Sequence, residues 1–80
     1  MDRTLTVSPA AFARVILKAV ELHEKSWDGR QMKHMRTKRE AVVDAMNAYL
    51  DVPKEFVQPI TYLLYHAEHE TLTWADRILA

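Results

Sequence analysis

Residues 30–50 carry the sequence RQMKHMRTKREAVVDAMNAYL, and the rest of the chain is arranged around this stretch. Its second half has the apolar spacing of an amphipathic helix, which predicts a face buried in a core. Five of the eleven Lys and Arg residues of the protein fall in its first ten positions. The predicted buried face consists of Val42, Val43, Met46, Tyr49 and Leu50, and the basic cluster consists of Arg30, Lys33, Arg36, Lys38 and Arg39.

A capping signal places the start of this helix. Thr37 precedes Glu40 by three residues, which is the spacing of a capping box, where each side chain bonds the backbone N–H of the other residue. We therefore predict a helix over residues 37–51, with the alternative that it begins at residue 30. Arg39 projects onto the middle of the apolar face, which disfavours the longer helix. Pro53 is expected to stop the helix, because the residue before a proline avoids the α conformation.

Two further helices are predicted from their starts and their periodicity. Ser8 can cap free N–H groups and Pro9 suits a first turn, so a helix is expected over residues 9–27. Pro59 gives a similar start for a helix over residues 59–79. Residues 4–7 (TLTV) alternate polar and apolar side chains, which is typical of a short strand or an extended arm. The two predicted apolar faces are Phe12, Val15, Ile16, Ala19, Val20, Leu22 and Trp27 in the first helix, and Ile60, Leu63, Leu64, Ala67, Trp74, Ala75 and Ile78 in the last.

Composition limits the fold to one small helical domain. The chain has 80 residues, 49% of them hydrophobic, with one glycine and no cysteine. We expect an all-α domain over residues 1–80, with three helices and an arm at residues 1–8. A core this small without disulfides is expected to be completed by a second copy, as a homodimer. The N-terminus has an acid at position 2 and no long apolar run, so a cytoplasmic protein without membrane spans is predicted.

Catalysis and cofactor binding are not supported by the sequence. No hydroxyl side chain lies in a pattern with a base and an orienting group, so we predict that the protein is not an enzyme and needs no cofactor. His66, His69 and Glu70 have the helical spacing of metal ligands, but a structural zinc site needs four ligands. A solvated polar face is therefore the favoured interpretation, with a metal-binding helical protein as a third hypothesis. His23, on the apolar face of the first helix, is interpreted as a core residue.

The basic cluster is the main functional lead. Cations oppose the dipole at a helix N-terminus, so local stability does not explain them there. Together with free N–H groups they form a patch that attracts anions. We predict a non-catalytic interaction module, an adaptor or inhibitor, that binds an acidic protein surface, with Leu17 and Leu72 as apolar anchors. Its size is typical of phage-encoded inhibitors of host machinery. The alternative is a solvated charged face without a partner.

A second interpretation is a DNA-binding repressor. The TLTV arm, the Ser-Pro helix start and the stretch TKREAVVDAMNAYL resemble the ribbon-helix-helix family over residues 3–20 and 37–50. In that family an N-terminal strand pairs across a dimer and lies in the major groove. The chain departs from the family in its longer first helix and in its additional last helix. The resemblance implies that Arg3, Thr4 and Thr6 read bases and that Thr37 holds a phosphate.

Overall fold

The computed structural model describes residues 7–27 and 35–80, which form helices and no strand. The elements are α1 (Pro9–Ser26), α2 (Lys38–Ala48), the short 3-10 helix η2 (Lys54–Phe56), α3 (Val57–His66) and α4 (Glu68–Leu79). The all-α prediction is confirmed for this part of the chain. The prediction of three helices is wrong, because these residues contain four α-helices. Most of the predicted arm lies outside the described residues, and Val7 and Ser8 are not in a strand.

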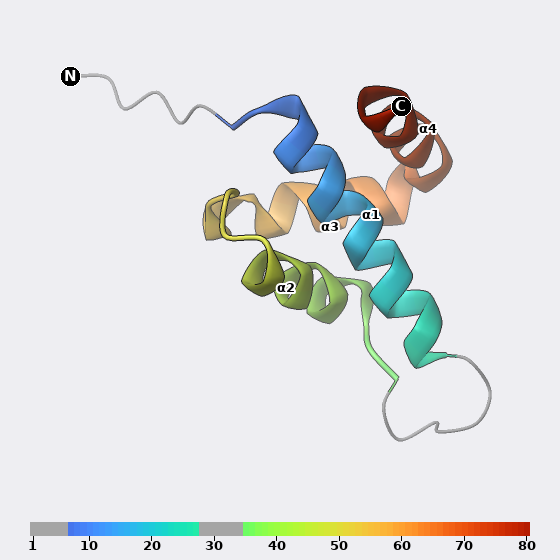
Figure 1. Ribbon diagram of the computed structural model, residues 1–80. Helices are drawn as coiled ribbons and strands as arrows, with labels where there is room; N and C mark the ends of the chain where they lie inside the picture. Colours follow the sequence, from blue (N-terminus) through green and yellow to red (C-terminus); the bar gives the residue numbers. More distant parts are fainter. Residues whose placement is uncertain (1–6, 28–34) are drawn as a thin grey trace.

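The helix α1 runs through the middle of the fold, with α2 and α4 on opposite sides of it (Figure 1). The third helix, α3, crosses behind α1 and packs against α2 and α4. One buried apolar cluster joins the four helices and the α2–η2 connection. Its members are Ala11, Ala13, Val15, Ile16, Ala19, Val20, Ala41, Val42, Ala45, Met46, Val52, Ile60, Leu64 and Ala75. None of the helices among the described residues is long and apolar enough to cross a membrane.

The ends of α1 follow from local hydrogen bonds. The Ser8 hydroxyl accepts the Ala11 N–H at 3.1 Å, and Pro9 lies at the first turn, so the predicted helix start is confirmed. At the other end α1 stops at Ser26, and Trp27 was wrongly predicted to be on the buried face. Because Trp27 lies beyond the last turn, it is 53% exposed.

The residues at the two ends of the α1–α2 connection are bonded to each other. The Ser26 hydroxyl accepts the Arg36 N–H at 2.9 Å and donates to the His23 carbonyl at 2.8 Å. The Trp27 indole N–H donates to the Arg36 carbonyl, also at 2.9 Å. Both backbone groups of Arg36 therefore bond to the end of α1, and this set of contacts holds the start of α2 beside it.

The capping box predicted for α2 is confirmed. The Thr37 hydroxyl accepts the Glu40 N–H at 3.1 Å, and a Glu40 carboxylate oxygen accepts the Thr37 N–H at 2.8 Å. Residues 35–37 are not helical, so α2 is not the continuation of a helix from residue 30. The helix ends at Ala48, before the predicted end at residue 51. Leu50 was wrongly predicted to be buried, because it lies past this end and is 82% exposed.

Replacing Thr37 with alanine removes the side-chain half of this cap. We expect the free energy of unfolding to fall by about 0.5–2 kcal/mol. Urea denaturation followed by circular dichroism measures the change. Thr73→Ala is the matched control, since the exposed Thr73 hydroxyl bonds only the His69 carbonyl within α4. Equal midpoints for the two variants would show that the box does not stabilise the fold.

The predicted continuous helix over residues 59–79 is wrong, because the chain leaves the α conformation at Ala67 (φ −148°, ψ 42°). In an unbroken helix the Leu64 carbonyl would accept the Glu68 N–H. Here the Lys38 ammonium donates to that carbonyl at 2.7 Å, and it also lies 3.3 Å from the Glu68 carboxylate. A side chain from α2, remote in sequence, thus takes the place of a helical hydrogen bond at the break.

Candidate functional site

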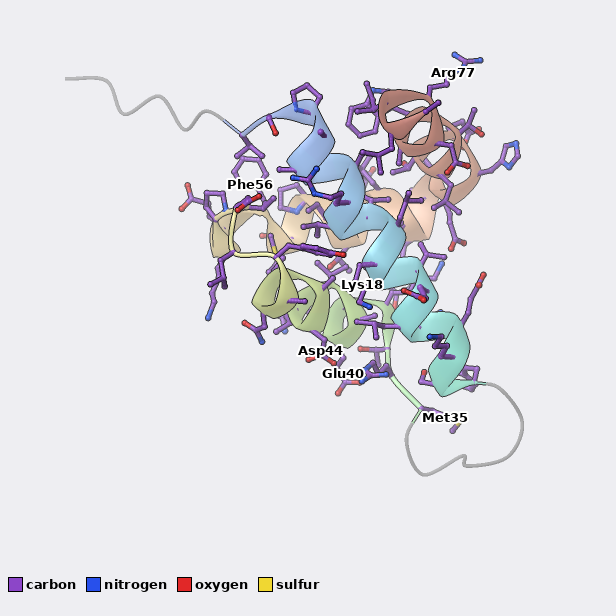
Figure 2. The ribbon with its side chains drawn as sticks, in the orientation of Figure 1. Lys18, Met35, Glu40, Asp44, Phe56 and Arg77 are labelled. Carbon is purple, nitrogen blue, oxygen red and sulfur yellow. The ribbon has the colours of Figure 1, made fainter. Side chains whose placement is uncertain are left out.

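The basic cluster is only partly described, and Arg30 and Lys33 lie outside the described residues. The Arg36 Nε donates to an Asp44 carboxylate oxygen at 2.7 Å, and its Nη1 donates to the Leu22 carbonyl at 3.4 Å. Figure 2 shows Asp44 and Glu40 on the same side of α2. The Arg36 side chain therefore links α2 to α1 through Asp44 and the Leu22 carbonyl.

Lys38 also makes contacts within the fold. Besides its bonds at the α3–α4 break, its ammonium lies 5.1 Å from the centre of the Tyr65 ring. Its side chain is only 22% exposed. Arg39 is exposed and forms no ion pair within residues 7–27 and 35–80. Of the three cluster cations that the structure describes, Arg39 is thus the one available to a partner.

The N-terminus of α2 is already occupied by an acid. The Glu40 carboxylate accepts the Thr37 N–H, and the Thr37 hydroxyl accepts the Glu40 N–H. A phosphate at this position would face a negative charge and would have to displace these bonds. The geometry therefore weakens the sequence argument for an anion site here. It equally weakens the phosphate-holding role that the ribbon-helix-helix resemblance implies for Thr37. Arg3, Thr4 and Thr6 lie outside the described residues.

The histidines are not arranged as a metal site in the described part of the chain. His66 ends α3 and His69 lies in α4, so the break at Ala67 removes their shared helical spacing. The His66 ring lies against Tyr62, with 4.3 Å between ring centres. The described residues contain no group of three metal-ligating side chains. His23, interpreted as a core residue, is instead half-buried, with its ring centre 6.0 Å from that of Trp27.

An apolar groove lies between α1, α3 and α4. It has a volume of about 370 Å³, and we call it the Trp74 groove; its lining residues are Phe12, Ile16, Leu63, Ala67, Glu70, Thr71 and Trp74. The ring of Phe12 meets that of Trp74 edge to face, with 6.1 Å between centres. Glu70 is the only charged residue of this lining. Because Ala67 is part of the lining, the change of direction between α3 and α4 shapes the groove.

A neighbouring hollow extends this apolar surface along α3. It has a volume of about 520 Å³ and shares Leu63 with the Trp74 groove; its other lining residues are Glu55, Gln58, Pro59 and Tyr62. Tyr62 is 61% exposed and Trp74 is 38% exposed. The sequence pattern assigned Leu63 and Trp74 to the buried face of one straight helix. Their position in an open groove was therefore not predicted.

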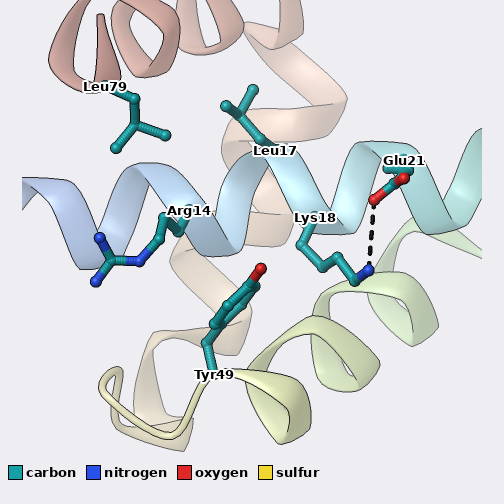
Figure 3. A pocket seen from close by; sticks show the side chains of 6 residues that line it. All are labelled: Arg14, Leu17, Lys18, Glu21, Tyr49 and Leu79. Atoms are coloured by element: carbon teal, nitrogen blue, oxygen red, sulfur yellow. Dashed lines mark ion pairs between the residues drawn. The ribbon is translucent and has the colours of Figure 1, made fainter.

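A third hollow, of about 370 Å³, lies between α1 and the C-terminal ends of α2 and α4. We call it the Arg14–Lys18 hollow, and it is lined by Arg14, Leu17, Lys18, Glu21, Tyr49 and Leu79. Figure 3 shows Tyr49 reaching from the end of α2 toward α1, between Arg14 and Lys18. Leu17, predicted as an apolar anchor, thus lines a surface hollow. Leu72, the other predicted anchor, is half-buried and packs against the core.

Loose ion pairs surround the Arg14–Lys18 hollow. Arg14 lies 3.5 Å from Asp51, and Lys18 lies 3.4 Å from Glu21. Glu21 also pairs with Lys25 at 3.2 Å, as the helical spacing predicts. The hydrogen bond from Lys25, with the nearby charge of Lys18, lowers the pKa of the Glu21 carboxyl below its ordinary value of 4.5. The carboxylate is therefore ionised at neutral pH and is shared between two ammonium groups.

Comparisons of the chain with protein families, with curated proteins and with solved structures find no match.

Proposed function

We propose that the protein is a small non-catalytic interaction module that binds another protein through the Trp74 groove. The observation that carries this proposal is an open groove lined by two aromatic rings and by aliphatic side chains. Aromatic side chains in such pockets supply much of the binding energy of protein interfaces. Ligand sites typically combine apolar walls with a few polar groups that fix orientation, and Glu70 is such a group here.

The charges around the groove indicate the partner. Glu70 lines the groove and Glu55 lines the neighbouring hollow, and neither forms an ion pair within the described residues. No Lys or Arg is among the residues that line these two depressions. A complementary partner segment therefore has an apolar face that contacts Trp74 and Leu63, and it carries cations at the margins of that face. An amphipathic helix from another protein, with Leu on one face and Lys at its margins, meets these requirements.

This proposal keeps the interaction class predicted from the sequence and moves the contact surface. The basic cluster was predicted to be the interface, but Arg36 and Lys38 make contacts within the fold. Arg39 stays a candidate for a secondary contact with an acidic group. That the chain is a phage-encoded inhibitor, or a homodimer, stays a prediction that rests on its size and composition.

A designed peptide tests the groove directly. The probe is a labelled amphipathic helical peptide with a Leu face and Lys margins, and its binding is measured by fluorescence anisotropy. We expect saturable binding, weakened about thirtyfold or more by Trp74→Ala, because truncating an aromatic anchor typically costs at least about 2 kcal/mol. Leu50→Ala is the control, since Leu50 is a large apolar residue that is 82% exposed and lines neither the groove nor the neighbouring hollow.

The charge requirement has its own control. Glu70→Lys should weaken the Lys-margin peptide about fivefold and strengthen a peptide with Glu margins, as expected for exposed ion pairs. The Trp74→Ala and Glu70→Lys variants must first show the same helical circular dichroism spectrum as the wild type. If folded Trp74→Ala protein binds the peptide as the wild type does, the groove is not the interface and the proposal is wrong.

A further inference from the structure

We infer that the Arg14–Lys18 hollow is a second binding site, for a carboxylate that is flanked by an apolar side chain. Arg14 and Lys18 are one helical turn apart on α1 and line the same hollow. Leu17 and Leu79 supply its apolar wall, and Tyr49 adds a hydroxyl. A ligand group that complements this set carries a negative charge next to a hydrophobic side chain, as an acidic and apolar segment of a partner protein does.

The charge balance around the hollow favours an anion. Three cations, Arg14, Lys18 and Lys25, face two carboxylates, Asp51 and Glu21, through ion pairs of 3.2–3.5 Å. A single carboxylate, that of Glu21, serves both lysines. Lys18 is therefore less fully neutralised than a lysine with a carboxylate of its own, and these five ion-paired groups carry one excess positive charge. A ligand carboxylate neutralises this excess positive charge.

The internal pairs are weak enough for a ligand to replace. The side chains of Arg14 and Asp51 are 42% and 62% exposed, and those of Lys18 and Glu21 are 33% and 47% exposed. Exposed pairs of this kind contribute little to stability because water screens them. In Figure 3 the charged ends of Arg14 and Lys18 point away from Tyr49, in opposite directions along α1. Both side chains are long and partly exposed, so each can turn toward a ligand group beside Tyr49.

This site is separate from the Trp74 groove. Phe12 and Arg14 are two positions apart in α1, as are Ile16 and Lys18, and this spacing turns the side chains by about 200° around the helix axis. The groove and the hollow therefore lie on different sides of α1, and both sites can be occupied at once. Two such sites on different sides of α1 suit an adaptor, which binds two partners.

The test uses the dipeptide N-acetyl-leucyl-glutamic acid and, as the uncharged analogue, its diamide. Chemical shifts of the Leu17 and Leu79 methyl groups and of the Tyr49 ring are followed by NMR during titration. We expect saturable shifts with the acid, and binding of the diamide weaker by about fivefold or more. The double variant Arg14→Gln, Lys18→Gln should weaken binding of the acid by at least the same factor. Higher salt should also weaken it, because both cations are partly exposed.

Two controls separate the site from general charge effects and from the groove. Arg39→Gln, Lys54→Gln removes one Arg and one Lys from exposed positions outside the hollow, and it should bind the acid as the wild type does. Trp74→Ala should also leave binding of the acid unchanged, even if it abolishes binding of the amphipathic peptide. Equal affinity for the acid and the diamide, or equal losses in the two double variants, would overturn the inference and leave the groove proposal untouched.

Discussion

Replacing Ile60 with alanine should lower the free energy of unfolding by about 2–5 kcal/mol. Ile60 is fully buried in α3, and it is among the largest side chains of the core. Its truncation removes apolar contacts and leaves a cavity that close-packed helices fill only partly. A chain of this length has a total stability of roughly 4–12 kcal/mol, so the loss is a large share of the total and the variant should unfold at a markedly lower urea concentration than the wild type.

Leu50→Ala is the control for this experiment. Leu50 is also a large aliphatic residue, but it is 82% exposed between α2 and η2. Its truncation should change the stability by no more than about 0.5 kcal/mol. Urea denaturation monitored by circular dichroism compares the two variants. If Ile60→Ala and Leu50→Ala unfold at the same urea concentration, α3 does not contribute to the core as described.

Replacing Lys38 with methionine should destabilise the protein and alter the junction of α3 and α4. Methionine retains an unbranched apolar stem of similar length but removes the ammonium. The Leu64 carbonyl then loses its donor and Glu68 loses its ion pair. Hydrogen bonds from charged groups contribute about 1.5–3 kcal/mol, and partial exposure of Lys38 places the expected loss toward the lower value.

The same variant should also favour an unbroken helix through Ala67. Without the ammonium, the Glu68 N–H is the nearest donor that can satisfy the Leu64 carbonyl in a continuous helix. NMR backbone shifts of Ala67 should move toward helical values, and binding of the amphipathic peptide should weaken as the groove changes shape. Arg39→Met is the control, because Arg39 is exposed on the neighbouring position. Unchanged shifts at Ala67 in a less stable Lys38→Met protein would show that other contacts set the break.

Local capping signals predicted the starts of α1 and α2 well. In contrast, α3 begins at Val57, two residues before the predicted start at Pro59, and the start of α4 at Glu68 was not predicted. The caps at Ser8 and Thr37 involve residues three positions apart, so their hydrogen bonds depend on almost nothing else in the fold. The apolar periodicity of α1 also identified most of its buried face, although Trp27 falls beyond the helix end. Periodicity treats a helix as continuing until a breaker residue appears, which is why Leu50 was assigned to the buried face of a helix that ends at Ala48.

The candidate sites were harder to predict because they depend on contacts between distant residues. No glycine or proline marks Ala67, and the donor that replaces the helical bond there is on Lys38, 26 residues before the carbonyl that it bonds. The break also shapes the Trp74 groove, because Ala67 is part of the groove lining. The Arg14–Lys18 hollow likewise combines one face of α1 with Leu79 at the end of α4 and Tyr49 just past the end of α2. Apolar periodicity does not indicate where these helix ends meet. The cations of the basic cluster were visible in the sequence, but the Asp44 partner of Arg36 was not assigned.

The bonds from Ser26 and Trp27 to Arg36 have a consequence for how the protein can be engineered. They tie residues that are nine or ten positions apart in sequence, so side chains at the end of α1 fix where α2 begins. Ser26, Trp27 and Arg36 should therefore be kept unchanged in any variant made to probe the two proposed binding surfaces, because a substitution there loosens the attachment of α2 to α1.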